Sequence, residues 1–320
     1  MRKIAVLTSG GDAPGMNPAV RAVVRRALSR GLEICGIKRG FAGMFDPTPF
    51  EDLETGSVAD IIHRGGTVLL TARAPEMMEP ENQDKAASRL KEDGIDGLVV
   101  IGGEGSFRGA QTLEQRGIKT ICIPGTIDND VKGTEQTIGF DTAVNTILHA
   151  INRLRDTATS HERVFIVEVM GRNDGYLALA AGLAGGAESI LIPEIEYNLD
   201  DVCDRVLKGI KRQKAHSIIV VAEGAGDVFE INKEICEKIK VDVRVTVLGH
   251  IQRGGTPSAV DRLLGSRMGA MAVDLLYENK QGLFTAVRGS EVVPASLEGC
   301  FKTEKEFPEE LYHLARDLST

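Results

Sequence analysis

Short apolar segments alternate with amphipathic segments along almost the whole chain, and this alternation restricts the possible folds strongly. The apolar segments are rich in valine and isoleucine and carry few polar positions. Strands of this kind are buried on both faces, which is typical of a parallel sheet covered by helices. The predicted strands are residues 3–8, 33–37, 96–101, 119–123, 164–169, 188–192, 216–222 and 243–248.

Helical patterns occupy the intervals between these strands. They include residues 16–30, 81–93, 107–116, 141–155, 175–185, 199–213 and 258–277. A chain of 320 residues can form two domains, each with its own core. No linker rich in proline, serine or glycine separates two halves. We therefore expect a domain border near residue 139 that the chain crosses more than once.

Composition excludes several classes of partner. The net charge of −8 disfavours non-specific binding to nucleic acid or to a membrane surface. Tryptophan is absent and aromatic residues make up only 4%, which argues against platforms for stacking bases. No apolar run approaches the length of a membrane span, and the first one is too short for a secretory signal. The five cysteines form no metal-binding pair, which favours reduced thiols in the cytoplasm.

Glycine-rich loops follow five of the predicted strands. Because ligands of open parallel sheets bind at the carboxyl ends of the strands, these loops indicate a binding edge. The loops are residues 9–17, 102–109, 124–130, 170–175 and 249–255.

The first two loops have features of phosphate sites. Gly10 and Gly11 lack a side chain, so backbone amides there can approach an anion, although a tight strand-to-helix turn explains them equally well. The second loop has Gly103 and Gly105, but Arg108 stands where a dinucleotide-binding motif has its third glycine. Ser106 and the nearby amides could hold phosphate oxygens. Glu104 is either a metal ligand or a solvated loop acid.

The loop at 124–130, "PGTIDND", places a hydroxyl and two carboxylates just past a strand. Phosphoryl transfer needs an oriented acceptor hydroxyl, a proton acceptor and charge neutralisation. Asp128 could accept the proton, Thr126 could orient the site and Asp130 could bind Mg²⁺. An Asx-turn is the alternative interpretation for this loop taken alone.

Arginines occur near element ends in the second half of an otherwise acidic chain. Arginine binds phosphate through two parallel hydrogen bonds and stays charged. Each one alone is more often a surface ion-pair partner. Beside several glycine loops, the set favours a phosphorylated substrate. It comprises Arg155, Arg163, Arg172, Arg244 and Arg253, with His250 close to the last.

Over nearly its full length the sequence resembles the bacterial ATP-dependent 6-phosphofructokinases. The resemblance implies two Rossmann-like three-layer domains: an ATP-binding domain of residues 1–139 and about 257–303, and a sugar-phosphate domain of residues 140–256 with the C-terminal tail. It implies a homotetramer. The motifs that carry it are "LTSGGDAPGMN", "RGGT", "GLVVIGGEGSF", "PGTIDND", "TIGFDTA", "RDTATSHERV", "EVMGR", "GLAGGAE", "VAEG", "VLGHIQRGG" and "DR".

The resemblance also implies an activity, namely Mg²⁺-dependent transfer of a phosphoryl group from ATP to the 1-hydroxyl of fructose 6-phosphate. Asp128 would be the base, with Thr126, Arg172 and Arg73 assisting, and Glu104 and Asp130 would hold the metal. ATP contacts would come from Gly11, Arg73, Ala74, Gly103, Glu104, Gly105 and Ser106. The sugar phosphate would contact Thr126, Ile127, Asp128, Arg163, Met170, Gly171, Arg172, Glu223, Arg244, His250, Ile251, Gln252 and Arg253.

The family also has an effector site for ADP and phosphoenolpyruvate, and Arg163 and Arg244 would reach the substrate from a neighbouring subunit. The effector site maps to Arg21, Arg25, Arg155, Gly186, Ala187, Glu188, Arg212, Lys214, Ala215 and His216. Thr55 and Ala215 stand where some members have basic residues, Ala74 replaces a larger side chain, and Glu104 replaces the usual aspartate.

Three alternative functions differ from this activity in the phosphoryl donor or in the class of protein. Pyrophosphate-dependent relatives carry aspartate at position 105 and lysine at position 125, and both are glycine here. A catalytically silent nucleotide-binding regulator is supported only by Glu104. A nicotinamide oxidoreductase is compatible with the sheet architecture, but a fold does not fix a function.

Overall fold

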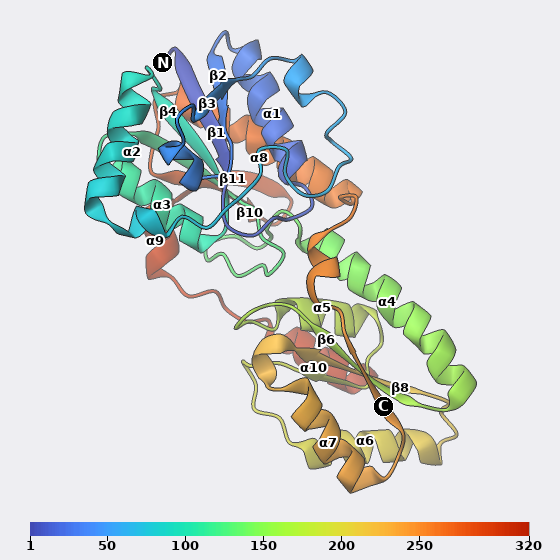
Figure 1. The fold of residues 1–320 in the computed structure, drawn as a ribbon. Coiled ribbons are helices and arrows are strands. Elements are labelled where there is room, and N and C mark those ends of the chain that lie inside the picture. Colours follow the sequence, from blue (N-terminus) through green and yellow to red (C-terminus); the bar gives the residue numbers. More distant parts are fainter. Residues whose placement is uncertain (320) are drawn as a thin grey trace. The chain divides into compact units, whose positions relative to one another are not determined.

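The structure is a computed structural model that describes residues 1–319, and in it the chain forms two compact units (Figure 1). Unit 1 comprises residues 1–142 and 253–305, and unit 2 comprises residues 143–252 with the segment from residue 306 onward. The chain passes from one unit to the other after residues 142, 252 and 305.

Unit 1 is built on a seven-stranded sheet with the order β11-β10-β5-β4-β1-β2-β3. The five central strands are parallel, while β3 and β11 run antiparallel at the two edges. The strands are β1 (Lys3–Thr8), β2 (Glu33–Ile37), β3 (Phe50–Asp52), β4 (Gly97–Gly102), β5 (Lys119–Pro124), β10 (Leu283–Arg288) and β11 (Glu291–Ser296).

Helices cover both faces of this sheet. Helices α1 and α8 pack together on one face, and α2, α3 and α9 lie on the other (Figure 1). They are α1 (Met16–Ser29), α2 (Pro80–Glu92), α3 (Glu104–Glu114), α8 (Ala259–Tyr277) and α9 (Leu297–Lys302), with short 3-10 turns η1 (Ala42–Phe45), η2 (Gly56–Val58) and η3 (Pro75–Met78).

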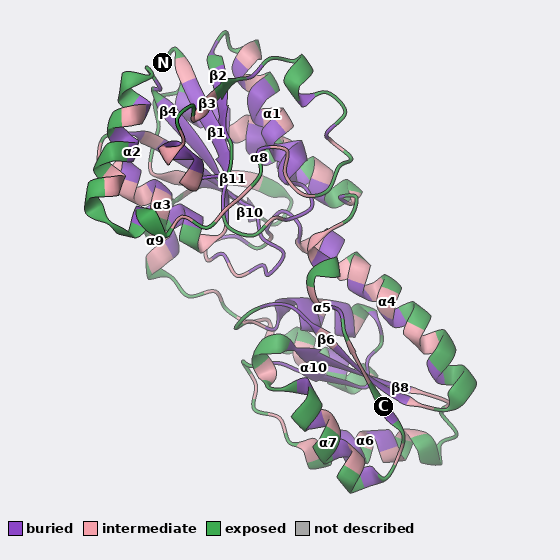
Figure 2. Cartoon of the chain, in the orientation of Figure 1, coloured by how far each residue is buried: buried purple, intermediate pink, exposed green. Residues whose placement is uncertain are grey.

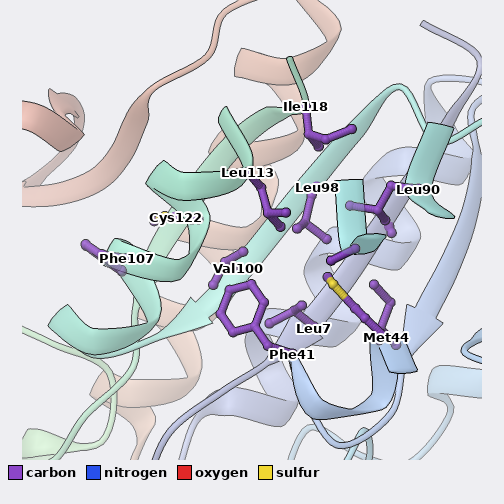
Figure 3. Packing of buried hydrophobic residues seen from close by; sticks show 14 of the residues in the cluster. Leu7, Phe41, Met44, Leu90, Leu98, Val100, Phe107, Leu113, Ile118 and Cys122 are labelled. Carbon is purple, nitrogen blue, oxygen red and sulfur yellow. The ribbon is translucent and has the colours of Figure 1, made fainter. Parts of the chain in front are cut away.

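The core beneath α2 and α3 is close-packed. Leu98 and Val100 of β4 meet Phe107 and Leu113 of α3, and Leu90 of α2 closes the layer (Figure 3). All five side chains are fully buried. Burial of a side chain of this size stabilises the fold by about 1.5–3 kcal/mol, so this layer fixes where α3 begins relative to the end of β4.

Unit 2 has a four-stranded parallel sheet with the order β7-β8-β6-β9. Helices α6 and α7 cover one face, and α5 lies on the other face with α10 packed against it. Strands β6, β7 and β8 are buried along most of their length, whereas the edge strand β9 is mostly half-buried or exposed (Figure 2). The elements are α4 (Phe140–His161), which starts in unit 1, β6 (Val164–Val169), α5 (Tyr176–Ala184), β7 (Ser189–Leu191), α6 (Leu199–Lys211), β8 (Ser217–Ala222), η4 (Glu223–Ala225), α7 (Val228–Ile239), β9 (Val243–Val247), η5 (Gly249–Arg253) and α10 (Glu309–Leu318).

The predicted α/β class with mostly parallel sheets is confirmed, and each predicted strand is present within a residue or two. Strands β3, β10 and β11 were not predicted. Strand β3 was missed because it has only three residues. Strand β11 was missed because it contains Pro294, and proline in a sheet is largely confined to edge strands. Helix α3 begins at Glu104 rather than at residue 107. Between residues 1 and 319 no helix is both long and apolar enough to cross a membrane.

Candidate active site

Three loops of unit 1 leave the carboxyl ends of adjacent parallel strands β1, β4 and β5. The register places Thr8 beside Ile101 and Gly102 beside Pro124, so the loops start side by side. The amide of Ser9 donates to the carbonyl of Ile101 (2.9 Å), and the amide of Gly125 donates to the carbonyl of Gly102 (3.0 Å). Three of the five loops predicted for one binding edge therefore form a continuous surface of unit 1, whereas the loops at 170–175 and 249–255 follow strands of a second sheet in unit 2.

The loop after β4 turns directly into α3, so its amides lie at a helix amino terminus, which attracts anions. The hydroxyl of Ser106 lies 3.4 Å from where a side chain at Gly10 would begin. At Gly102 a Cβ atom would lie 2.5 Å from Ser106 Oγ and 2.5 Å from the Ser9 carbonyl. Only glycine at position 102 lets the first two loops approach this closely.

The segment that carries Arg73 and Ala74 is tied to the first loop. Thr71 Oγ1 donates to the carbonyl of Gly10 (2.7 Å), and Thr8 Oγ1 donates to the carbonyl of Leu70 (2.8 Å). Arg73 is exposed two residues further on, and Ala74 packs against the core below. Arg73 is thus positioned beside the glycine loop after β1.

The loop after β5 holds the candidate base. Asp128 is fully buried, and its amide donates to Thr126 Oγ1 (3.2 Å). Asn129 adopts a left-handed backbone with φ of 53°, and its side-chain amide donates to the carbonyl of Glu135 (3.1 Å). Lys305 Nζ donates to the carbonyl of Asn129 (2.5 Å). The turn is closed by the threonine side chain, and contacts from Glu135 and Lys305 hold it from two sides.

The candidate metal residues follow neighbouring strands, β4 and β5. Glu104 opens α3 and pairs with Arg108 one turn later (Oε1 to Nη2, 2.6 Å). The Arg108 guanidinium in turn lies over the ring of Phe301, 4.7 Å from its centroid. Among residues 1–319 no three metal-ligating side chains gather into a cluster. Two carboxylates fit Mg²⁺, which commonly takes only one or two protein carboxylates and completes its shell with phosphates and water.

Unit 2 has its own group of candidate residues, at the carboxyl ends of β6, β8 and β9. Glu223 Oε1 accepts from the amides of Gly171 (3.2 Å) and Arg172 (2.7 Å), which holds Arg172 at a φ of 55°. The buried Gln252 accepts from the amide of Met170 (3.2 Å) and donates to the carbonyl of Gly249 (2.9 Å). Glu223 therefore shapes the loop that presents Arg172.

At Gly224 a side chain would collide with the carbonyl of Arg172, 2.3 Å from its Cβ. The glycine that follows Glu223 thus allows the backbone of Arg172 and Asn173 to lie against η4, the turn after β8. His250 and Ile251 are exposed on the neighbouring loop.

Arg163 and Arg244 lie elsewhere in unit 2. Both pair with Asp242, Arg163 at 2.8 Å and Arg244 at 3.1 Å. Arg163 precedes β6 and Arg244 is the second residue of β9, so both lie at the amino edge of the sheet. Residues 170–172 lie at the carboxyl end of β6, about 20 Å away along six residues. Within unit 2 the sheet thus separates this arginine pair from the loop that presents Arg172.

Comparison with known proteins assigns the chain to a family. The family model described as Phosphofructokinase matches residues 3–276. The chain belongs to the phosphofructokinase family. It is 56% identical to the protein named ATP-dependent 6-phosphofructokinase of Natranaerobius thermophilus, and also 56% identical to that of Clostridium tetani. Each alignment covers all of both chains.

Solved structures of phosphofructokinases share this fold. The phosphofructokinase of Saccharomyces cerevisiae superposes with a TM-score of 0.90 at 32% identity over the whole of this chain, which spans about half (48%) of the yeast chain. A pyrophosphate-dependent phosphofructokinase from Marinobacter aquaeolei superposes with a TM-score of 0.85 at 22% identity, covering 97% of this chain and 86% of that one. At 22% identity the second likeness shows the fold alone.

Most of the predicted effector residues of this phosphofructokinase gather in unit 2. Lys214 pairs with the buried Glu188 (2.5 Å), and His216 Nδ1 bonds Thr159 Oγ1 (3.0 Å). Arg155 donates to the carbonyl of Gly185, next to Gly186. Burial lowers the pKa of His216, and the nearby arginine and lysine lower it further, against the opposing charge of Glu188. Arg21 and Arg25 lie on α1, and Arg212 follows α6.

Sequence reasoning missed three residues that support the site. They are Arg108, which engages Glu104, Lys305, which holds the 128–130 turn, and Asp261, which binds backbone amides at the start of α4. Arg108 stands four residues after Glu104, so helical spacing could have revealed that pair. Lys305 and Asp261 lie more than a hundred residues from their partners in sequence. Asp261 belongs to the "DR" motif of the resemblance, but no local pattern indicates the partners of either residue.

Proposed function

We propose that this phosphofructokinase transfers the terminal phosphoryl group of ATP to the 1-hydroxyl of fructose 6-phosphate, a glycolytic reaction of the cytoplasm that yields fructose 1,6-bisphosphate. One observation carries the proposal, namely the continuous edge of unit 1 at which two amide-lined glycine loops adjoin the turn with Thr126 and Asp128. The full-length relatives named ATP-dependent 6-phosphofructokinase support the same donor and acceptor.

The residues of this edge suggest a division of roles. The loop at 103–106 and the α3 amino terminus would hold ATP phosphates, together with Gly11 and Arg73. Asp128 would accept the proton of the acceptor hydroxyl, while Thr126 fixes the turn by accepting from the Asp128 amide. Arg172 and Arg73 would neutralise the charge on the phosphoryl group in transit.

Mg²⁺ would be held by Glu104 and Asp130, with water completing its shell. When bound, it would neutralise phosphate charge during transfer. The Arg108 guanidinium that pairs with Glu104 competes for this carboxylate. Glu104 would therefore contribute through a bridging water or after release from Arg108.

Two glycines bear on the phosphoryl donor. No atom lies within 4 Å of where a Cβ at Gly105 would stand, so glycine leaves open space for a nucleotide phosphate that an aspartate would occupy and repel. At Gly125 a Cβ would lie 3.1 Å from Ile101 Cγ2 and 3.2 Å from Met16 Cε, so a lysine would crowd the apolar packing. Both positions therefore favour ATP over pyrophosphate.

The sugar phosphate would bind to Met170, Gly171, Arg172, Glu223 and the 250–253 loop. Arg163 and Arg244 are also expected at the 6-phosphate, yet they lie at the amino edge of their own sheet. A second copy of the chain would have to supply them, which supports a homo-oligomer, and we propose a tetramer. The cluster around Glu188 and Lys214 would bind ADP or phosphoenolpyruvate, whose phosphates suit its basic side chains.

A coupled assay tests the proposal. The purified protein is given fructose 6-phosphate and Mg²⁺ with either ATP or pyrophosphate, and formation of the bisphosphate is followed. We expect turnover with ATP and none with pyrophosphate. Asp128→Asn should lower kcat by about 10²–10⁴-fold with KM values nearly unchanged. Turnover with pyrophosphate alone would refute the donor assignment, and near-normal turnover of the variant would refute the base. NAD(H) binding without phosphoryl transfer would favour the oxidoreductase alternative.

A further inference from the structure

Asp261 on α8 is a carboxylate that is completely buried within unit 1. Its Oδ1 accepts from the amide of Gly139 (2.7 Å). Its Oδ2 accepts from the amide of Thr142 (2.8 Å) and from the Thr142 hydroxyl (2.5 Å). A carboxylate buried so deeply is tolerated only when it is hydrogen-bonded. These three bonds make Asp261 an anchor for the start of α4.

The anchor is part of a closed ring of hydrogen bonds. Thr142 Oγ1 accepts from the amide of Ser258 (2.9 Å), and Ser258 Oγ accepts from the amide of Asp261 (3.2 Å). Ser258 is the cap residue of α8. The ring therefore locks the first turn of α4 to the first turn of α8, two segments that lie more than a hundred residues apart.

The segment that Asp261 holds is paired with the loop of the candidate base. Ile138 donates to the carbonyl of Pro124 (3.0 Å), and its own carbonyl accepts from the amide of Thr126 (3.1 Å). Thr137 Oγ1 donates to the carbonyl of Thr126 (2.7 Å). The Thr126 backbone is thus bonded on both sides to residues 137 and 138, directly before the Gly139 amide that Asp261 binds.

Gly139 brings a third loop into this assembly. At its φ of 104° a Cβ would lie 2.7 Å from Ala13 Cβ and 3.3 Å from Ile127 Cγ2. Gly15 is similarly confined, because a Cβ there would lie 3.2 Å from Asp261 Cβ. The backbone that Asp261 fixes therefore packs between the glycine loop after β1 and the turn after β5.

We propose that Asp261 is a positioning residue for phosphoryl transfer: by fixing residues 139–142 it holds the 124–128 turn and the 11–15 loop in register for the acceptor hydroxyl and the ATP phosphates. The inference rests on the proposed function. Asp261 touches no substrate and acts through the backbone of Thr126. A misplacement of reacting groups by about 1 Å can lower the rate by about 10²-fold.

Asp274 offers a matched control on the same helix. It lies thirteen residues further along α8 and pairs with Arg26 (2.7 Å) and Arg30 (2.8 Å) of α1. Like Asp261 it links α8 to another segment of unit 1. It contacts neither the 124–128 turn nor the 137–142 segment among the interactions of the described residues.

The test compares Asp261→Asn with Asp274→Asn in the full chain. The Asp261→Asn substitution keeps the shape of the side chain but turns one acceptor into a donor that faces a backbone amide. We expect kcat to fall by about 10²-fold in Asp261→Asn, with KM for both substrates changed less than about 3-fold. Asp274→Asn should lower the melting temperature without changing kcat. If Asp261→Asn also loses only stability and keeps kcat, the proposal is wrong.

Hydrogen exchange supplies a readout that does not depend on activity. Peptides covering residues 124–142 should exchange at least about 10-fold faster in Asp261→Asn and at the wild-type rate in Asp274→Asn. Unchanged exchange in these peptides would overturn the positioning role. If the wild-type protein fails to phosphorylate fructose 6-phosphate, the proposed function falls, while the exchange comparison still decides whether Asp261 orders the turn.

A second pair of variants covers the case in which Asp261→Asn does not fold. Thr142→Ser keeps the hydroxyl that donates to Asp261, whereas Thr142→Val removes it and also leaves the Ser258 amide without its acceptor. We expect Thr142→Ser to retain kcat within about 2-fold and Thr142→Val to lose about 10-fold, with faster exchange over residues 124–142. Equal kcat in the two variants would contradict the role of the ring.

Discussion

Arg253 Nη1 lies 2.4 Å from the point at which a side chain at Gly11 would begin. The same guanidinium donates a long bond of 3.5 Å to the carbonyl of Asp12. A residue expected at the sugar 6-phosphate and a residue expected at the ATP phosphates therefore share one space in unit 1. Because Gly11 has no side chain, the Arg253 guanidinium fits beside the loop where ATP phosphates are expected.

Gly11→Ala should weaken substrate binding while leaving the fold intact. The added methyl group displaces only the flexible end of Arg253, so we expect a melting temperature within about 2 °C of the wild type. The displaced arginine should raise KM for fructose 6-phosphate by about 10-fold or more, the loss of one charge-assisted contact. Steady-state kinetics and thermal unfolding measure both effects. Gly56→Ala is the control, because nothing lies within 4 Å of a Cβ there. An unchanged KM would mean that Arg253 does not contact the sugar phosphate.

Arg108→Met should increase the affinity of the site for divalent cations. The substitution removes the positive charge that lies 2.6 Å from the Glu104 carboxylate. We expect the Mg²⁺ concentration for half-maximal rate to fall by about 3-fold, and Mn²⁺ binding in the presence of ADP, followed by electron paramagnetic resonance, to tighten likewise.

The matched control for Arg108→Met is Arg116→Met. Arg116 pairs with Asp84 (2.6 Å) just past the other end of α3. Both cation measurements should stay at their wild-type values in this control. If Arg108→Met also leaves them unchanged, Glu104 takes no part in metal binding.

Mixing two inactive variants should restore activity if subunits share active sites. Asp128→Asn lacks the base and Arg244→Ala lacks an arginine expected from a neighbouring subunit. Dissociating and reassociating the two together creates some sites with an intact Asp128 from one chain and an intact Arg244 from another. We expect a substantial part of the wild-type rate to return in the coupled assay. No recovery would show that each site uses one chain only.

The stabilisation that Asp261 contributes should depend on pH. Burial raises the pKa of Asp261 to about 6, because desolvation outweighs its hydrogen bonds, and the nearby Asp141 raises it further. The folded state therefore holds this proton more tightly than the unfolded state does, and the associated stability is lost as pH rises from about 4 to about 6. The difference in unfolding free energy between the wild type and Asp261→Asn should fall by up to about 3 kcal/mol over that range. Urea unfolding of both proteins at several pH values measures it, and a constant difference would contradict the raised pKa.

The binding edge was predictable because its signals are local. An apolar strand followed by glycines is visible within ten residues, and the loops at 9–17, 102–109 and 124–130 do adjoin one another in unit 1. The full sheet was less predictable. Strand β10 pairs with β5 through only a short register and ends up as the neighbour of a strand about 160 residues earlier, which no local pattern encodes.

The supporting residues of the site escaped prediction for the same reason. Asp261 looks like an ordinary residue in the first turn of a helix, and its partners at 139 and 142 become neighbours only after folding. Arg163 and Arg244 were predicted as phosphate ligands from a neighbouring subunit, and the strand directions, which only the structure gives, place them at the opposite end of their sheet from the 170–172 loop. Residue roles that depend on the order and direction of strands can be assigned only once the structure is known.

The path of the chain has a consequence for synthesis on the ribosome. Residues 143–252 of unit 2 interrupt the sequence of unit 1. Helix α8, which covers one face of the large sheet together with α1, is therefore encoded after the four strands of unit 2. Until residue 277 has left the exit tunnel, β5 and the adjacent part of β4 lack the cover that α8 provides on one face. The nascent chain therefore carries an exposed apolar sheet surface while the inserted unit matures. Molecular chaperones that shield such surfaces should engage the growing polypeptide during this interval and release it once α8 docks.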